Sequence, residues 1–472
     1  MTLRALLVAA VLFVPLRGHA AERLPNILVV LFDDMGWGQP PSYWSDSALR
    51  TPRLDQLAAE GMRFTDAHAA AAVCTPTRYG LLTGRYPLRI GQFGVLTTYS
   101  PPIIPPGRMT VASLLKHQGY HTACIGKWHL GMNWVDGQPG TEREVPLDAR
   151  MTGGPNDVGF DYFCGFTHAR NIGTVIEQDR VIAHVAPVDN QPLMIRKAVE
   201  YIDERTRQVP EQPFFLYFPM CPPHEPIVPT DAMRGRSGAQ DVVRHHPQYG
   251  DWVYQGDAML GALLDALERN QLTERTLVIA TSDNGAEHRP YPPLRESKRS
   301  IYEGGHRIPF VARWPGRITP GAVCTETVCL NDVLATCAEL VGASVPANAG
   351  EDSISLLSTL LGTAREPVRE ATIHQSPAGE LAIRQGPWKL VFLRGGVRQL
   401  YNLDSDLSET RDVSESHGDV VERLTARLRR DLDNGRSTAG PAQSNDVPVS
   451  LDQLQQGPQR KAKKARSKAK PE

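Results

Sequence analysis

The sequence predicts an α/β protein with a large, mostly parallel sheet flanked by helices, followed by a smaller antiparallel sheet with a covering helix. Two observations predict the large sheet: apolar runs of strand length alternate with helical patterns, and the runs lack polar positions, as expected for strands buried on both faces. A third observation predicts the small sheet, because beyond residues 342–353 the pattern changes to short strands separated by glycine-containing turns.

The first twenty residues are predicted to be a secretory signal that is removed from the mature chain. Arg4 supplies a positive start, residues 5–16 form an apolar run too short to span a bilayer, and Gly18 and Ala20 are small residues at the two positions that a signal peptidase reads. We therefore expect a secreted or periplasmic protein without a membrane span. An N-terminal core helix or an uncleaved anchor is the alternative for this segment.

Four predicted strands end in polar residues. In an open α/β sheet, ligands bind beyond the carboxyl ends of the strands, so neighbouring strands would bring these residues to one edge. A polar residue after a strand is common, and Asp-Asn-Gly alone is typical of a turn, but four coincidences in one chain favour a functional site. The strands are residues 27–32, 121–125, 214–218 and 277–280, and the polar residues are Asp33, Asp34, Lys127, His129, His224, Asp283 and Asn284.

The pattern divides the mature chain into three parts. Residues 21–345 are expected to form the large α/β domain, and residues 346–440 a smaller α+β subdomain in which residues 420–432 form an amphipathic helix. Residues 441–472 are polar, then strongly basic, and are expected to be a disordered tail.

The overall charge argues against nucleic acid as a partner. The chain carries 51 Lys and Arg residues against 52 Asp and Glu residues, a net charge of −1. Seven cysteines in an exported protein leave at least one unpaired, and the sequence does not fix a disulfide pattern.

The segment around Cys74 places a cysteine, an anion-binding position and a guanidinium close together. Pro76 suits the first turn of a helix, so Cys74 lies at the helix N-terminus, where free amides favour an anion. Arg78 follows one turn later and can reach the same place. The spacing between them is too short for a phosphatase of the thiolate type. A structural cysteine at a helix start is the alternative.

Taken together, the motifs resemble those of the formylglycine-dependent sulfatases. The resemblance extends over about residues 24–415 and is greatest to the arylsulfatase and N-acetylgalactosamine-6-sulfatase branch. It implies an alkaline-phosphatase-like sheet and a sulfuric ester hydrolase acting on a sulfated carbohydrate or an aryl sulfate. The motifs are Asp33-Asp34, Cys74-Thr75-Pro76-Thr77-Arg78, Gly126-Lys127-Trp128-His129, Ser282-Asp283-Asn284-Gly285, and Lys298 ahead of Glu303-Gly304-Gly305.

The resemblance also implies a modified nucleophile. Cys74 would be oxidised to formylglycine by a separate maturation enzyme, and hydration of the aldehyde would give a geminal diol. One hydroxyl attacks sulfur, and the other, once deprotonated, expels sulfate and restores the aldehyde. A serine would lack this internal route of release.

The other site residues are implied by the same motifs. The ion would be Ca²⁺, with Mg²⁺ as the alternative, because the side chains offer oxygen atoms that suit a hard cation. Arg78, Lys127 and Lys298 would neutralise the sulfuryl oxygens. His129 would handle the diol proton, and His224 would protonate the leaving alcohol. The implied metal ligands are Asp33, Asp34, the residue made from Cys74, Asp283 and Asn284.

Two other functions stay open from the sequence. A phosphodiester or phosphonate monoester hydrolase of the same superfamily would use a similar cysteine-derived nucleophile, and a sulfated-glycan binder without activity would keep Cys74 unconverted. The histidines outside the motifs are expected to cap a helix, to lie at the surface or to have a structural role. They are His168, His245, His246 and His306.

Overall fold

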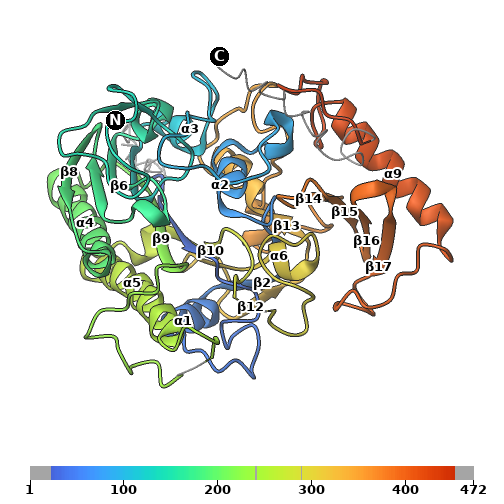
Figure 1. Cartoon of the computed structure of the whole chain (residues 1–472), viewed down its shortest axis with the longest axis horizontal. Helices are drawn as coiled ribbons and strands as arrows, with labels where there is room; N and C mark the ends of the chain where they lie inside the picture. The colour runs from blue at the N-terminus through green and yellow to red at the C-terminus, as the bar shows by residue number, and fades with distance from the viewer. Residues whose placement is uncertain (1–22, 240–241, 289, 452–472) are drawn as a thin grey trace, which may run out of the picture.

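The computed structural model describes residues 23–239, 242–288 and 290–451, and its largest element is an eleven-stranded mixed sheet (Figure 1). Its strands lie in the order β12-β2-β11-β10-β1-β9-β3-β6-β7-β8, and β13 pairs separately with β2. The strands are β1 (Asn26–Asp33), β2 (Met62–His68), β3 (His121–Lys127), β6 (Tyr162–Phe166), β7 (Thr174–Glu177), β8 (Arg180–His184), β9 (Phe214–Pro223), β10 (Thr276–Ser282), β11 (Arg307–Arg313), β12 (Ala322–Cys324) and β13 (Val328–Cys329). A separate pair is formed by β4 (Asn133–Trp134) and β5 (Met151–Thr152).

Helices cover both faces of this sheet. Along β1, Val29 packs into the core that includes α2 and α3, whereas Val30 packs into the core that includes α4 and α5, which explains the unbroken apolar run. Among the described residues, no helix is both long enough and apolar enough to cross a membrane. The helices are α1 (Pro52–Glu60), α4 (Pro187–Gln208) and α5 (Tyr249–Arg269) on one face, and α2 (Cys74–Thr83), α3 (Val111–His117) and α7 (Val333–Leu340) on the other.

The small antiparallel sheet lies at one end of the large one (Figure 1). It consists of β14 (Thr372–Gln375), β15 (Leu381–Gln385), β16 (Trp388–Phe392) and β17 (Arg398–Asn402). The helix α9 (Gly418–Asp433) covers it, and Leu424 and Leu428 pack against Ile383 and Leu390. The predicted fold class is therefore confirmed for both sheets.

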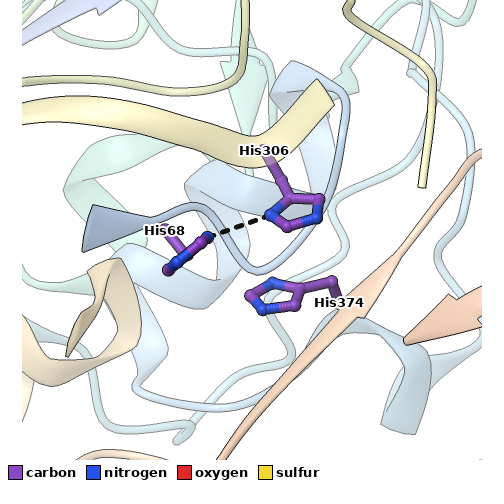
Figure 2. A group of neighbouring side chains, drawn as sticks. All are labelled: His68, His306 and His374. Carbon is purple, nitrogen blue, oxygen red and sulfur yellow. Dashed lines mark hydrogen bonds between the residues drawn. The ribbon is translucent and has the colours of Figure 1, made fainter. Parts of the chain in front are cut away.

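Three buried histidines join the two sheets (Figure 2). His68 lies in β2, His306 in α6 (Glu303–His306) and His374 in β14. The Nδ1 atoms of His68 and His306 are 3.1 Å apart, and the rings of His306 and His374 stack with centroids 4.0 Å apart. Lys389 Nζ can donate to His306 Nε2 at 3.1 Å, and His68 Nε2 can donate to Asp66 at 2.8 Å. Neutral rings then satisfy the hydrogen bonds of the His68–His306 chain, which agrees with the structural role expected for His306.

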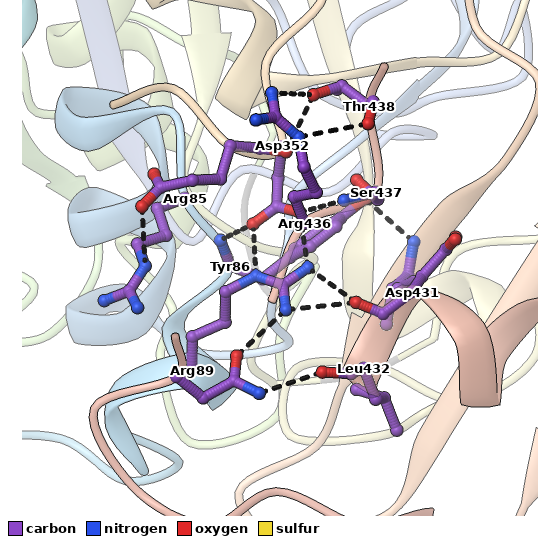
Figure 3. A network of polar contacts seen from close by, with 12 residues as sticks. Arg85, Tyr86, Arg89, Asp352, Asp431, Leu432, Arg436, Ser437 and Thr438 are labelled. Atoms are coloured by element: carbon purple, nitrogen blue, oxygen red, sulfur yellow. Dashed lines mark hydrogen bonds and ion pairs between the residues drawn. The ribbon is translucent and has the colours of Figure 1, made fainter. Parts of the chain in front are cut away.

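The structure corrects the predicted start of the disordered tail. Arg89 is fully buried and binds Asp352 through two hydrogen bonds of 2.7 and 2.6 Å (Figure 3), and it also donates to Asn445 at 3.0 Å. Arg85 donates to Asp446 at 2.9 Å. Residues 441–451 are therefore held against the body, because these contacts compensate two buried guanidinium groups. The predicted signal at 1–20 and the basic stretch of the tail lie outside the described residues.

Candidate active site

The four strands that end in polar residues are neighbours in the sheet. β10, β1, β9 and β3 lie side by side and are parallel, so their carboxyl ends share one edge. Phe32 of β1 is in register with Ser282 of β10, which brings Asp33 next to Asp283. β3 and β9 extend further than predicted, so Lys127 is the last residue of β3 and His224 directly follows β9.

The acidic residues form a compact buried group. Asp34 adopts a left-handed backbone with φ of 72° and donates its amide to Asp283 Oδ1 at 3.1 Å. Asn284 Nδ2 donates to Asp34 Oδ1 at 2.7 Å. Asp33 Oδ1 and Asn284 Oδ1 are buried and lack a hydrogen-bond partner among the described residues. Buried acceptors without a donor fit a cation, and an all-oxygen set suits a hard divalent ion such as Ca²⁺ or Mg²⁺.

The pKa values of these carboxyl groups also favour a bound cation. Burial, followed by repulsion from Asp33, raises the pKa of Asp283 to about 6. Burial likewise raises the pKa of Asp34 well above its usual range, whereas at Asp33 the effect of burial is outweighed by Lys127 and the other cations, so its pKa falls. Three carboxyl groups this close repel one another, and a divalent cation would relieve that repulsion.

Cys74 is the first residue of α2, as the sequence predicted, and is 2% exposed. Its Sγ and carboxylate oxygens of Asp33 and Asp283 lie within 4.8 Å of one another. Burial raises the pKa of the Cys74 thiol, despite the attraction of Lys127 and Lys298. An unmodified Cys74 would therefore be a neutral thiol and a poor nucleophile, because the thiolate is the reactive form.

The three predicted cations bind these carboxylates directly. Arg78 donates to Asp283 Oδ2 from Nε at 3.1 Å and from Nη2 at 2.7 Å, and Nη1 donates to the Lys127 carbonyl at 3.0 Å. Lys127 Nζ donates to Asp33 at 2.5 Å. Lys298 Nζ, which comes from the loop before α6, lies 2.7 Å from Asp34. The three cations thus balance the three carboxylates in number, and all six side chains are buried.

The two predicted histidines lie at the same edge in different environments. His129 Nε2 is 3.0 Å from the Leu96 carbonyl, and its buried Nδ1 has no hydrogen-bond partner among the described residues. His224 Nδ1 is 2.5 Å from the Glu225 carbonyl, and its Nε2 lies 3.8 Å from Asp34. Burial, followed by Lys127, lowers the pKa of His129 well below its usual range, and burial lowers that of His224 to about 3.

Sequence reasoning missed three residues that support the site. Glu287 accepts from Lys298 at 3.0 Å, so this lysine is held by both Glu287 and Asp34. Leu96 contributes the carbonyl that orients His129. His168 stacks on His129 with ring centroids 5.5 Å apart. Only Glu287 had a local signal, because it follows the Asp-Asn-Gly motif by two residues.

Comparison with known proteins gives the family. The sulfatase family profile matches residues 25–343. The chain is 29% identical to an N-acetylgalactosamine-6-O-sulfatase of Bacteroides thetaiotaomicron, with 86% of this chain and 92% of that protein covered. It is 34% identical to human arylsulfatase A, with 80% of this chain and 77% of the relative covered.

The fold agrees with this similarity. A solved structure from work on glycosaminoglycan metabolism by Bacteroides thetaiotaomicron superposes with a TM-score of 0.79 at 28% identity, covering 86% of this chain and 99% of that one. The profile match covers more than half of the chain and includes the strand ends and α2. The chain belongs to the sulfatase family and is an enzyme that hydrolyses sulfate esters.

Proposed function

We propose that the enzyme removes sulfate from a sulfated carbohydrate through a formylglycine hydrate made from Cys74, with a divalent cation held at the same edge of the sheet. The observation that carries the proposal is the convergence of Cys74 with Asp33 and Asp283 in one buried group, with ligand atoms within 4.8 Å. The relative from Bacteroides thetaiotaomicron is named for a sulfated amino sugar, which supports a carbohydrate substrate. Aryl sulfates would be convenient chromogenic substrates, in keeping with the similarity to arylsulfatase A.

The cation would be held by oxygen atoms of Asp33, Asp34, Asp283 and Asn284, together with the oxygen of the residue made from Cys74. We propose Ca²⁺, with Mg²⁺ as the alternative, because the donors are oxygen atoms. When bound, the ion supplies positive charge beside the sulfuryl oxygens and favours the ionised form of the diol. The buried oxygens of Asp33 and Asn284 that accept no hydrogen bond from the described residues support this assignment.

His129 is suited to take the proton of the diol. A carbonyl oxygen only accepts hydrogen bonds, so His129 Nε2 donates to Leu96, and Nδ1 carries the lone pair. The lowered pKa of His129 keeps the ring neutral, which is the form a base requires. Proton loss from the second hydroxyl would then restore the aldehyde as the bond between its carbon and the sulfated oxygen breaks, so that sulfate leaves with that oxygen.

The leaving alcohol would be served by His224 and Lys298. His224 Nδ1 donates to the Glu225 carbonyl, so in the neutral ring Nε2 carries the lone pair, and it is the atom that would take up a proton and pass it to the leaving alcohol. Lys298 lies between Asp34 and Glu287, with Nζ 3.0 Å from the latter, and is placed to neutralise charge that develops on the ester oxygen. Arg78 and Lys127 lie next to Asp283 and Asp33.

We also propose that the protein is exported and meets two partners, a sulfated glycan and a formylglycine-generating maturation enzyme. The export signal expected at residues 1–20 supports a secreted or periplasmic location. Nucleic acid is not an expected partner at a net charge of −1.

Two measurements test the function. Sulfate esters should be turned over with a higher kcat/KM than phosphate diesters or phosphonate monoesters across a matched panel, and the reverse ranking would favour the phosphodiester alternative. Mass spectrometry of the tryptic peptide covering residues 64–78 should show formylglycine in protein from its native host. An intact thiol there, together with binding of sulfated glycans without turnover, would leave only the binder.

A further inference from the structure

A second group of metal-ligand side chains lies beyond the same edge of the sheet. Glu225 follows β9, His246 precedes α5, and His288 lies in the loop after β10. One ligand atom from each lies within 4.8 Å of the others, and His246 Nε2 is 3.0 Å from Glu225 Oε1. The rings of His246 and His288 have centroids 4.5 Å apart. Two connections, the one between β9 and α5 and the one after β10, therefore deliver two imidazoles and a carboxylate to one point.

His288 has an unsatisfied nitrogen at this point. Its Nε2 is buried and has no hydrogen-bond partner within the described ranges. The ring is held edge-on by buried Tyr249, with centroids 5.4 Å apart and planes at 86°. A buried lone pair or N–H without a partner calls for a ligand.

The donor set selects the class of ion. Two imidazoles and one carboxylate form a typical zinc set, with ligand bonds of about 2.0–2.2 Å and a tetrahedral shape. Ca²⁺ prefers six to eight oxygen atoms, which this group does not offer. The side chains of Glu225 and His246 are 51% and 31% exposed, so an ion can enter and a water can complete the shell. By contrast, the His68–His306 pair is already satisfied through Lys389 and Asp66.

We propose that Glu225, His246 and His288 bind Zn²⁺, forming a second cation site separate from the oxygen site at the strand ends. Glu225 directly follows His224, and His288 directly follows Glu287, whose carboxylate accepts a hydrogen bond from Lys298 at 3.0 Å. Zinc therefore ties together the loops that carry His224 and Glu287. Metal retention is measured without reference to turnover, so the zinc site is tested independently of the proposed sulfatase mechanism.

The test is zinc binding by the full enzyme with Ca²⁺ in excess, so that the oxygen site stays filled. The apparent Kd for Zn²⁺ is measured by chelator competition, and metal content is measured after gel filtration. Wild type should retain about one equivalent of Zn²⁺, whereas His246→Ala, His288→Ala and Glu225→Gln should each weaken binding at least about tenfold. Co²⁺ in place of Zn²⁺ should give a visible absorption band of a low-coordinate site in wild type only.

The matched control is His245→Asn, next to His246. His245 is exposed and has a φ of 71°, a conformation that asparagine tolerates. This variant should bind Zn²⁺ as wild type does. Equal zinc binding by wild type and all three ligand variants would overturn the proposal. So would equal loss in His245→Asn, because binding would then depend on the loop rather than on these ligands. Thermal melting in Ca²⁺ identifies any variant that is misfolded, and the proposal is then judged on Glu225→Gln, the mildest change.

Discussion

Lys298 offers the sharpest test of how the active site works. Its Nζ lies 2.7 Å from Asp34 and 3.0 Å from Glu287, and the side chain is 3% exposed. Lys298→Met keeps the length of the side chain and removes only the charge and the donors. If the lysine stabilises charge that develops on the ester oxygen, kcat should fall by about 10²–10³, which corresponds to about 2.7–4 kcal/mol.

Arg299→Met is the matched control, because Arg299 binds the same Glu287 at 2.5 Å but is 57% exposed. An exposed pair contributes less than about 1 kcal/mol, so the rate should change by less than about fivefold. The assay is initial rates on an aryl sulfate, corrected for the formylglycine content of each preparation. A Lys298→Met rate within tenfold of wild type would refute the assigned role.

Lys298→Met should also lower the free energy of unfolding, by an amount that depends on whether Ca²⁺ is bound. Removing one partner of a buried ion pair costs about 3–5 kcal/mol, because the buried Asp34 carboxyl is left without its cation. A divalent cation would compensate Asp34, so the loss of stability in Lys298→Met should be clearly smaller in Ca²⁺ than in chelator. Urea unfolding under both conditions measures the difference. An equal loss in both would show that Asp34 is not a metal ligand.

Further outcomes follow from other contacts. Cys74→Ser should release about one equivalent of alcohol and then stop, whereas Cys74→Ala should release none; steady turnover by either would reject the diol mechanism. Burial lowers the pKa of His168 to about 4. The contribution of its neutral ring to the free energy of unfolding is therefore complete above pH 6.5, and it is lost as the pH falls towards 4. At about 1.4 kcal/mol per pKa unit, wild type should lose about 3 kcal/mol more over that interval than His168→Asn, as measured by urea unfolding, and parallel curves would contradict this. Arg89→Met should cost about 3–5 kcal/mol, because it leaves Asp352 buried without its cation, and a change below 1 kcal/mol would show that the pair is not coupled. Finally, sulfate should tighten Ca²⁺ binding by the same factor by which Ca²⁺ tightens sulfate binding, as measured by calorimetry, and independent binding would argue against one shared site.

The sequence predicted the parts of the site that depend on local pattern. Unbroken apolar runs predict strands buried on both faces, and the residues after them must then lie at the carboxyl edge. Thr110 caps α3 through the Ser113 amide at 3.0 Å, and Gly84 ends α2 with a φ of 65°, and both are residue types favoured at these helix ends. These features need no knowledge of the chain beyond a few neighbouring residues.

Features that depend on distant segments could not be predicted. The contact between Arg85 and Asp446 joins residues 361 positions apart, and the polar composition of residues 441–451 carried no sign of it. His246 was expected at the surface, but it meets Glu225 and His288 because the two ends of the connection between β9 and α5 converge with the loop after β10. Composition describes what a segment can bury by itself, whereas these segments are ordered by partners elsewhere in the fold.

The balance of charge in the site explains why a sulfate ester is a suitable substrate. Asp33, Asp34 and Asp283 are opposed by Arg78, Lys127 and Lys298, and all six side chains are almost completely buried. A divalent cation would occupy the carboxylates and so free the three cationic side chains to bind an anion. A neutral ligand would leave those buried cations uncompensated, at a large cost in free energy. The ester anion would take the place of the carboxylates beside these cations. Contacts with the substrate would then replace ion pairs that are already present in the protein, so the site can be buried and still bind an anion.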